Sequence, residues 1–332
     1  MISNRYGFNI QWMYSYDYQN TPREPDEKIL DFISEKGFNT IRLPLDYRFW
    51  INNHRYFDPV EEPFSYIDSY LEECQKRDLH LIINLHRAPG YCINKNEIEI
   101  DNLWLDKIAR DAFVFQWQYI SERYKDVASD ELSFDLLNEP PSIGEYGMTR
   151  NNHEELIRNT VAAIRAIDKK RTIIIDGLCG GNKVLPEVSD LDVIQSTRGY
   201  QPMALTHYKA SWWEPEQQVP QPVYPGLEWK GKIWDKQTIK KFYLPWLELE
   251  ENEVEIFVGE FGCYNKIENE IALKWFGDIL ALFEEFNWGF LLWNFQGPFG
   301  IADHGRPGTE YKKIDGFKID YKLLELLVEF QS

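Results

Sequence analysis

The chain has 332 residues and a net charge of −18, from 36 Lys and Arg against 54 Asp and Glu. Nucleic acids and anionic membrane surfaces repel so acidic a protein, which disfavours both as partners. Aromatic residues make up 15% of the chain, including 12 Trp and 19 Tyr; this suits stacking on the flat faces of a neutral sugar ligand, or equally a large aromatic-rich core.

Short β-rich runs recur along the whole chain and predict eight strands. Several are continuous apolar runs, such as residues 81–83 and 173–175, which is typical of strands buried on both faces in a parallel sheet. The eight predicted strands are residues 6–11, 40–44, 79–85, 132–137, 172–176, 203–206, 255–259 and 289–293.

Helical patterns separate the predicted strands. Residues 25–33 begin with Pro25 and acidic residues, place apolar residues at helical spacing, and are followed by Gly37, as at the start and end of a helix. Similar patterns predict helices over residues 64–77, 109–124, 154–167, 239–250, 271–286 and 322–330, and residues 186–190 show a weaker one. Buried strands alternating with helices predict a (β/α)8 TIM barrel. No linker composition divides the chain, so we expect a single barrel domain over residues 1–332.

The longest irregular stretch covers residues 209–236. It holds four prolines and the aromatic residues Trp212, Trp213, Tyr224, Trp229 and Trp234. Long loops in compact domains are usually functional or disordered, and a loop this rich in Trp is a poor candidate for disorder. We expect part of it to form the wall of a binding cleft; the alternative is a loop that packs against the outer helices.

Polar and aromatic side chains stand at the ends of the predicted strands, where catalytic groups lie in barrels of this class. They are Arg42, His86, Asn138, Glu139, His207, Tyr208, Glu260 and Trp293. Glu139 and Glu260 each follow an apolar strand, and two carboxylates across a cleft carry out glycoside hydrolysis. Either Glu alone could simply accept hydrogen bonds at the rim, but the pair with its polar neighbours favours catalysis.

This ordered set resembles the shared active-site positions of the retaining glycoside hydrolases of family 5, the cellulase family, over the whole chain. The tripeptide Asn138-Glu139-Pro140 is moderately specific by itself, whereas the ordered set is very specific. The resemblance implies that Glu139 is the acid/base and Glu260 the nucleophile. Their carboxyl groups should lie about 5 to 5.5 Å apart, as direct nucleophilic attack requires.

The resemblance also implies roles for the other six residues. Arg42 would be the cationic neighbour of Glu260 and Tyr208 a hydroxyl donor to it, and both would orient the carboxylate. Asn138 would bind the sugar 2-hydroxyl, and Trp293 would form the platform under the sugar being cleaved. His86 would bind a hydroxyl of that sugar, and His207 would position or tune Glu139.

Metal and cofactor chemistry is not expected. The sequence has no HxH or HExxH spacing, and the resemblance calls for no metal. Cys74, Cys92, Cys179 and Cys263 form no CxxC pair, so we expect free thiols. The N-terminus shows no secretory signal and no apolar run is long enough to span a bilayer; this favours a cytoplasmic enzyme, although trimming of a leader would leave the same sequence.

The expected activity is that of a retaining, endo-acting β-glycoside hydrolase on β-1,4-glucan or related soluble β-linked oligosaccharides. The same catalytic set also serves β-mannanases and exo-acting β-glucosidases, and fold and mechanism do not separate these substrates. A sugar-binding barrel without activity is the alternative from another class, but such proteins usually lack a catalytic acid. The oligomeric state is not indicated by the sequence.

Overall fold

The computed structural model describes residues 4–94 and 99–331, which divide into two compact units. Unit 1 contains residues 4–10, 32–39 and 198–331, and unit 2 contains residues 11–31, 40–94 and 99–197. Both units carry parallel strands followed by helices, and each is described by itself below.

Unit 2 is built on a parallel sheet whose strands follow chain order. They are β2 (Thr40–Asp46), β3 (His80–Ala88), β5 (Leu132–Asp135), β6 (Thr172–Asp176) and the first part of β7 (Ile194–Gly199). Each strand pairs in parallel with the next, so their carboxyl ends meet at one edge. A short strand, β4 (Tyr91–Cys92), turns back antiparallel to the end of β3. Nearly every residue of these strands is buried, as the apolar runs predict.

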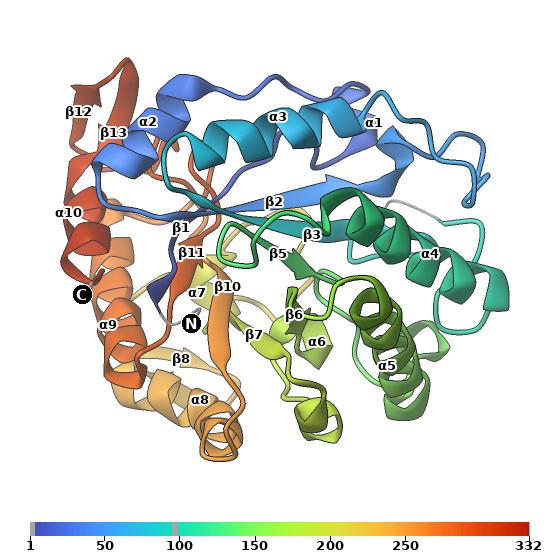
Figure 1. Ribbon diagram of the computed structural model, residues 1–332. Coiled ribbons are helices and arrows are strands. Elements are labelled where there is room, and N and C mark those ends of the chain that lie inside the picture. Colours follow the sequence, from blue (N-terminus) through green and yellow to red (C-terminus); the bar gives the residue numbers. More distant parts are fainter. Residues whose placement is uncertain (1–3, 95–98, 332) are drawn as a thin grey trace. The chain divides into compact units, whose positions relative to one another are not determined.

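The helices of unit 2 follow its strands, except for the first, which precedes β2. They are α1 (Tyr16–Gln19), α3 (Phe64–Gln75), α4 (Lys107–Tyr124), α5 (Arg150–Ile167) and α6 (Leu178–Gly181), with 3-10 turns η2 (Tyr47–Phe49), η3 (Glu145–Gly147) and η4 (Pro186–Leu191). The longest two, α4 and α5, lie side by side (Figure 1). A capping box fixes the start of α5, since Thr149 and Asn152 each accept a backbone N–H from the other.

Unit 1 contains three parallel strands in the order β1 (Tyr6–Asn9), β11 (Phe290–Leu292) and β10 (Ile256–Phe261). The buried amide of Asn9 ties them together, since Nδ2 donates to the carbonyls of Gly259 at 3.0 Å and Leu292 at 3.4 Å. Phe261 packs edge-on against Phe283 and Phe290, with ring centroids 5.5 and 5.4 Å away. These contacts bury the carboxyl end of β10, directly after Glu260.

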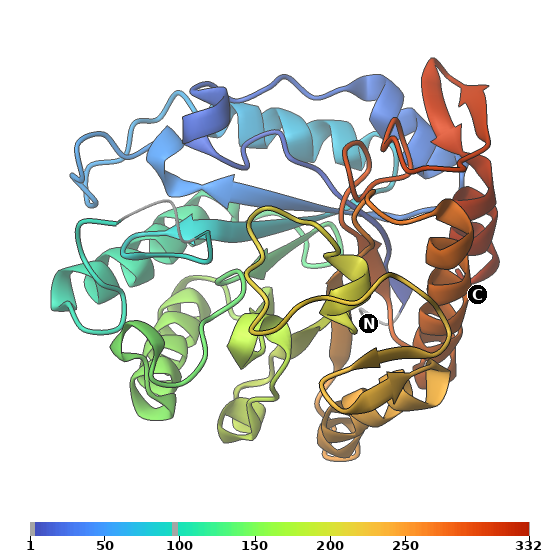
Figure 2. The ribbon, with the colours of Figure 1, turned by 180° about the vertical axis from the view of Figure 1, so that it is seen from behind.

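The helices of unit 1 are α7 (Met203–Thr206), α8 (Lys236–Glu250), α9 (Asn269–Phe286) and α10 (Tyr321–Glu329), and α2 (Glu27–Glu35) runs from unit 2 into unit 1. Two antiparallel hairpins, β8 (Leu227–Trp229) with β9 (Lys232–Trp234) and β12 (Tyr311–Ile314) with β13 (Phe317–Asp320), are absent from the sequence prediction. Figure 2 shows the first hairpin beside α8. Asp235 caps α8, accepting the N–H of Thr238 at 2.8 Å.

The fold class is the predicted (β/α)8 barrel. Eight parallel strands, β1, β2, β3, β5, β6, β7, β10 and β11, are each followed by helix before the next. Seven of the predicted strands match these elements, with shifts of a few residues at their ends.

The sixth predicted strand, residues 203–206, is wrong. These residues form α7, and the sixth strand is β7, about nine residues earlier in the chain. The run 194–199 reads Ile-Gln-Ser-Thr-Arg-Gly and so lacks the apolar signature of a buried strand. It is nevertheless buried because its polar side chains have partners: Gln195 bonds both backbone groups of Leu185, and Thr197 donates to the carbonyl of Gly181.

Two smaller expectations concern membranes and cysteines. Across residues 4–94 and 99–331, no helix combines the length and the apolar character needed to cross a bilayer. The four cysteines are thiols, as predicted: Cys74, Cys92 and Cys263 are buried and Cys179 is exposed.

Candidate active site

Glu260 lies at the end of β10 in unit 1 and is buried, with 3% of its surface exposed. Nη2 of Arg198 lies 3.3 Å from one carboxylate oxygen, and the Tyr200 hydroxyl donates to the other at 3.1 Å. Arg198 is fully buried, and its own carbonyl accepts the hydroxyl of Tyr243 at 3.0 Å. One cation and one hydroxyl on separate oxygens balance the charge of the carboxylate and fix its plane.

The hydroxyl donor to Glu260 is therefore Tyr200 and not Tyr208, which corrects the expectation drawn from the resemblance. The Tyr208 hydroxyl donates instead to Gln221 at 3.3 Å. Tyr208 follows α7, not a strand, because the sixth strand ends earlier. The missed signal was the Arg-x-Tyr spacing of Arg198 and Tyr200, since alternate residues of an extended chain share one face.

His207 follows α7 and is buried in unit 1. Its Nδ1 lies 3.0 Å from the Thr206 hydroxyl, and its ring packs 5.1 Å from that of Tyr200. Burial lowers the pKa of His207 to about 3, so the ring is neutral near pH 7. Its predicted action on Glu139 stays a prediction.

Aromatic rings extend from Tyr200 toward the surface of unit 1. Phe299 lies 6.1 Å from Tyr200, and Trp212 lies 6.2 Å from Phe299 and 5.0 Å from Tyr264, between ring centroids. Trp212 is 55% exposed. Trp293, directly after β11, is half-buried, and its backbone N–H donates to the Phe261 carbonyl at 2.8 Å.

Glu139 lies in unit 2, just beyond β5, and is half-buried. Its N–H donates to Oδ2 of Asp176 at 2.9 Å, and its carbonyl accepts the Tyr91 hydroxyl at 2.7 Å. Its backbone has a φ of +46°, in the left-handed region that few residues other than glycine adopt. Neither Asp176 nor Tyr91 was identified from the sequence.

Arg42 is fully buried in β2 and organises the residues before Glu139. Its Nε donates to Asp135 at 2.7 Å, and its Nη2 donates to Oδ1 of Asn138 at 2.9 Å and lies 3.9 Å from Asp176. The amide of Asn138 is thereby oriented with its NH2 group away from Arg42. The structure thus brings together two predicted residues, Arg42 and Asn138, while the predicted place of Arg42 beside Glu260 stays a prediction.

His86 lies near the carboxyl end of β3, which pairs with β5, and Asn138 and Glu139 follow the carboxyl end of β5. His86 is buried, and its ring lies 4.6 Å from that of Tyr14, whose hydroxyl accepts the amide of Asn94 at 3.2 Å. Its predicted contact with a sugar hydroxyl stays a prediction.

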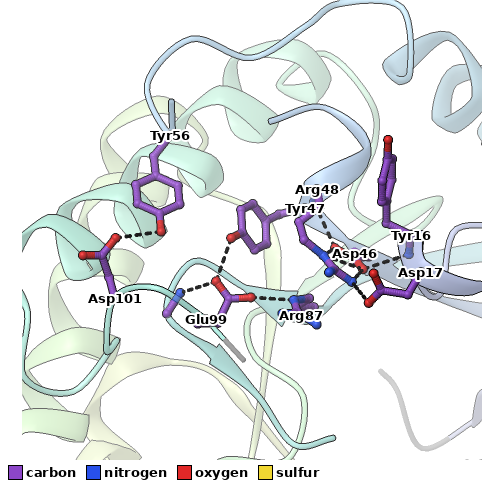
Figure 3. Close-up of polar contacts among 10 residues, drawn as sticks. Tyr16, Asp17, Asp46, Tyr47, Arg48, Tyr56, Arg87, Glu99 and Asp101 are labelled. Carbon is purple, nitrogen blue, oxygen red and sulfur yellow. Dashed lines mark hydrogen bonds and ion pairs between the residues drawn. The ribbon is translucent and has the colours of Figure 1, made fainter. Parts of the chain in front are cut away.

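Figure 3 shows a polar network at the ends of β2 and β3 that the sequence did not indicate. Glu99 pairs with Arg87 and accepts the Tyr47 hydroxyl at 2.7 Å and the Gly90 N–H at 3.2 Å. Burial, followed by the Glu99 charge, raises the pKa of Tyr47, so its hydroxyl is a neutral donor. Beside it, Asp46 pairs with Arg48. The network fixes the loops that leave both strands.

The described part of the chain holds no group of three His, Cys, Asp or Glu side chains placed to bind a metal ion.

Comparison with known proteins identifies the family of the chain. The model of the family Cellulase (glycosyl hydrolase family 5) matches residues 3–297. Endoglucanase C of Acetivibrio thermocellus is 30% identical, covering 89% of this chain and 92% of that protein. A crystal structure of a glycoside hydrolase is 57% identical with a TM-score of 0.96, covering 98% of this chain and 99% of its own. Thermotoga maritima Cel5A in complex with a mannotriose substrate is 25% identical with a TM-score of 0.76, covering 97% of each chain. The chain is therefore a glycoside hydrolase that belongs to glycosyl hydrolase family 5, the cellulase family.

Proposed function

We propose that this enzyme cleaves β-1,4-glucan or related soluble β-linked oligosaccharides internally, by a retaining double displacement. Glu260 is the nucleophile and Glu139 the acid/base. The observation that carries this assignment is the pair of donors on Glu260: Arg198 and Tyr200 hold one buried carboxylate at a strand end. A nucleophile must be oriented and charged before the sugar arrives, whereas an acid/base must exchange protons with leaving group and water, which suits the half-buried Glu139.

The reaction proceeds in two balanced steps. Glu260 attacks the anomeric carbon while Glu139 gives its proton to the glycosidic oxygen, so the bond to the leaving sugar breaks and a glycosyl ester of Glu260 forms. Glu139, now a carboxylate, then takes a proton from water as that water attacks the anomeric carbon and frees Glu260. Two inversions give net retention.

The substrate class is supported by the relatives. The name of Endoglucanase C, which covers 89% of this chain, favours internal cleavage of a glucan. A β-mannan is the second candidate, because the similar Cel5A structure holds a mannotriose substrate. Digestion of soluble β-glucans and β-mannans of defined length, with products resolved by size, separates the glucan, mannan and exo-acting possibilities.

Replacing each carboxylate in turn tests the assignment. Glu260→Ala should abolish turnover of every substrate because the ester cannot form. Glu139→Ala should lose about 100- to 10,000-fold on natural oligosaccharides, yet keep most of its glycosylation rate on 2,4-dinitrophenyl glycosides, whose leaving group needs no proton. Azide should then rescue deglycosylation and give a β-glycosyl azide. An α-glycosyl azide from Glu139→Ala would reverse the two roles, and proton NMR that showed the α-anomer as first product would exclude retention.

A further inference from the structure

We propose that Tyr91 and Asp176 are positioning residues that hold the backbone of Glu139 and thereby aim its carboxyl group for proton transfer. The inference rests on the acid/base role of Glu139 proposed above. The Tyr91 hydroxyl donates to the carbonyl of Glu139, and Asp176 accepts the backbone N–H of Glu139. Hydrogen bonds therefore hold the peptide groups on both sides of the Glu139 Cα. Fixing both groups fixes φ and ψ, and these set the direction of the Cα–Cβ bond from which the carboxyl group hangs.

The backbone around Glu139 is tied along its length. The N–H of Asn138 donates to the Leu85 carbonyl at 3.0 Å, and the carbonyls of Pro140 and Pro141 accept the N–H groups of Gly180 at 2.9 Å and Cys179 at 3.2 Å. These bonds hold the flanks of the segment, whereas Tyr91 and Asp176 act on Glu139 itself. A left-handed φ at a non-glycine residue persists only where its surroundings enforce it.

Tyr91 is itself firmly placed. It begins β4 directly after Gly90, which has a φ of +83° and leaves no room for a Cβ, since that atom would lie 2.5 Å from the Leu103 nitrogen. Glu99 accepts the backbone N–H of the same Gly90 at 3.2 Å. The ring of Tyr91 packs edge-on against Trp104 at 5.5 Å and Tyr146 at 5.9 Å. The hydroxyl therefore approaches Glu139 from a fixed support.

The hydrogen bond from Tyr91 persists near neutral pH. Burial, followed by the charge of Glu139, raises the pKa of Tyr91 well above its ordinary value, so its hydroxyl keeps the proton that it donates. Asp176 is buried at the end of β6, with the guanidinium of Arg42 3.9 Å away. Proton transfer depends steeply on geometry, since a displacement of roughly 1 Å in an active site can cost about 100-fold in rate.

The test compares kcat/KM for a β-linked oligosaccharide, which needs a proton donor, with kcat/KM for a 2,4-dinitrophenyl glycoside, which does not. Tyr91→Phe should lower the ratio of the first to the second by at least about tenfold, a part of the effect of losing the acid altogether. The matched control is Tyr70→Phe: Tyr70 is also buried in unit 2 and donates its hydroxyl to a backbone carbonyl, that of Arg23. It should leave the ratio unchanged.

Asp176 provides a second pair of variants. Asp176→Ala removes the acceptor for the Glu139 N–H and should lower the ratio, whereas Asp176→Asn keeps an oxygen acceptor and should restore most of it. If Tyr91→Phe unfolds, as judged by circular dichroism, the comparison of the two Asp176 variants decides the question.

Distinct outcomes separate this inference from the proposed function. A wild-type ratio in both Tyr91→Phe and Asp176→Ala, even with lower rates on both substrates, would make these contacts merely structural. If Glu139→Ala itself kept the wild-type ratio, the acid/base assignment would fail first. A low ratio for Glu139→Ala together with unchanged ratios for the two positioning variants would overturn only the inference.

Discussion

Arg198, near the end of β7, and Tyr200, just beyond it, both donate to the carboxylate of Glu260. Arg198 and Tyr200 are separated by a single residue, Gly199, and a Cβ at Gly199 would lie 2.5 Å from the Cβ of Phe261. The missing side chain thus allows β7 to approach the residue after Glu260. Two side chains that point the same way from an extended segment then reach the two oxygens together.

Tyr200→Phe tests this geometry at the scale of one hydroxyl. A hydrogen bond to a charged group contributes about 1.5 to 3 kcal/mol, so its loss should lower kcat/KM by roughly tenfold to 100-fold, on aryl glycosides as well as oligosaccharides, because the nucleophile serves both. Tyr208→Phe is the matched control, since its hydroxyl donates to Gln221. Equal losses in both variants would contradict the role given to Tyr200.

The residues of the site differ in how readily the sequence alone identifies them. Glu139 and Glu260 follow apolar runs, so strand prediction and chemistry together lead to them. Arg198 lies in β7 and Tyr200 directly after it. The residues of this strand are largely polar because their side chains find partners inside the protein, and a single sequence does not reveal those partners. Asp176 ends an apolar strand, but nothing in the sequence distinguishes an aspartate that accepts a backbone N–H from any other aspartate.

At the scale of elements, the Trp-rich loop divides into a half that packs on a helix and a half that carries an exposed ring, and its predicted role as a cleft wall stays a prediction. Its second half forms the β8–β9 hairpin against α8. Trp229 and Trp234 are buried there, and the indole N–H of Trp234 donates to the Trp229 carbonyl at 3.3 Å. Trp212, in the first half, is exposed and belongs to the aromatic cluster that includes Tyr200. The pattern of aromatic residues predicted a structured loop, but only packing distinguishes a buried ring from an exposed one.

Trp212→Ala should therefore lower activity on long substrates, whereas Trp234→Ala should lower the stability of the fold. Loss of an exposed stacking face should lower kcat/KM by about tenfold on long oligosaccharides and leave short aryl glycosides nearly unchanged. Loss of the buried Trp234 should cost about 3 to 5 kcal/mol of unfolding free energy, seen as a lower Tm with the same substrate preference. Unchanged cleavage of long chains by Trp212→Ala would assign the whole loop to packing.

At the scale of the whole molecule, each unit contains a buried histidine that is neutral in the folded state. His207 lies in unit 1, and His153 lies on α5 in unit 2, stacked 5.8 Å from Trp104. Burial lowers the pKa of each to about 3, with Arg150 adding to the effect at His153. An unfolded chain protonates both histidines below about pH 6.5. Below that pH the unfolded state binds more protons, so folding stability falls as the pH drops from about 6.5 toward 3.

His153→Phe should flatten part of this pH dependence, because phenylalanine fills the same space against Trp104 and does not titrate. His153 suits the test since neither ring nitrogen has a hydrogen-bond partner among the described residues, so the substitution leaves no donor or acceptor stranded. Thermal unfolding at pH 7 and pH 4.5 should show a smaller fall in Tm for the variant than for the wild-type protein, with His207 responsible for part of what remains. His54→Asn is the control: His54 is exposed and has a φ of +55° that asparagine tolerates, so it should keep the wild-type difference. Equal falls in all three proteins would mean that protonation of His153 in the unfolded state does not govern acid stability.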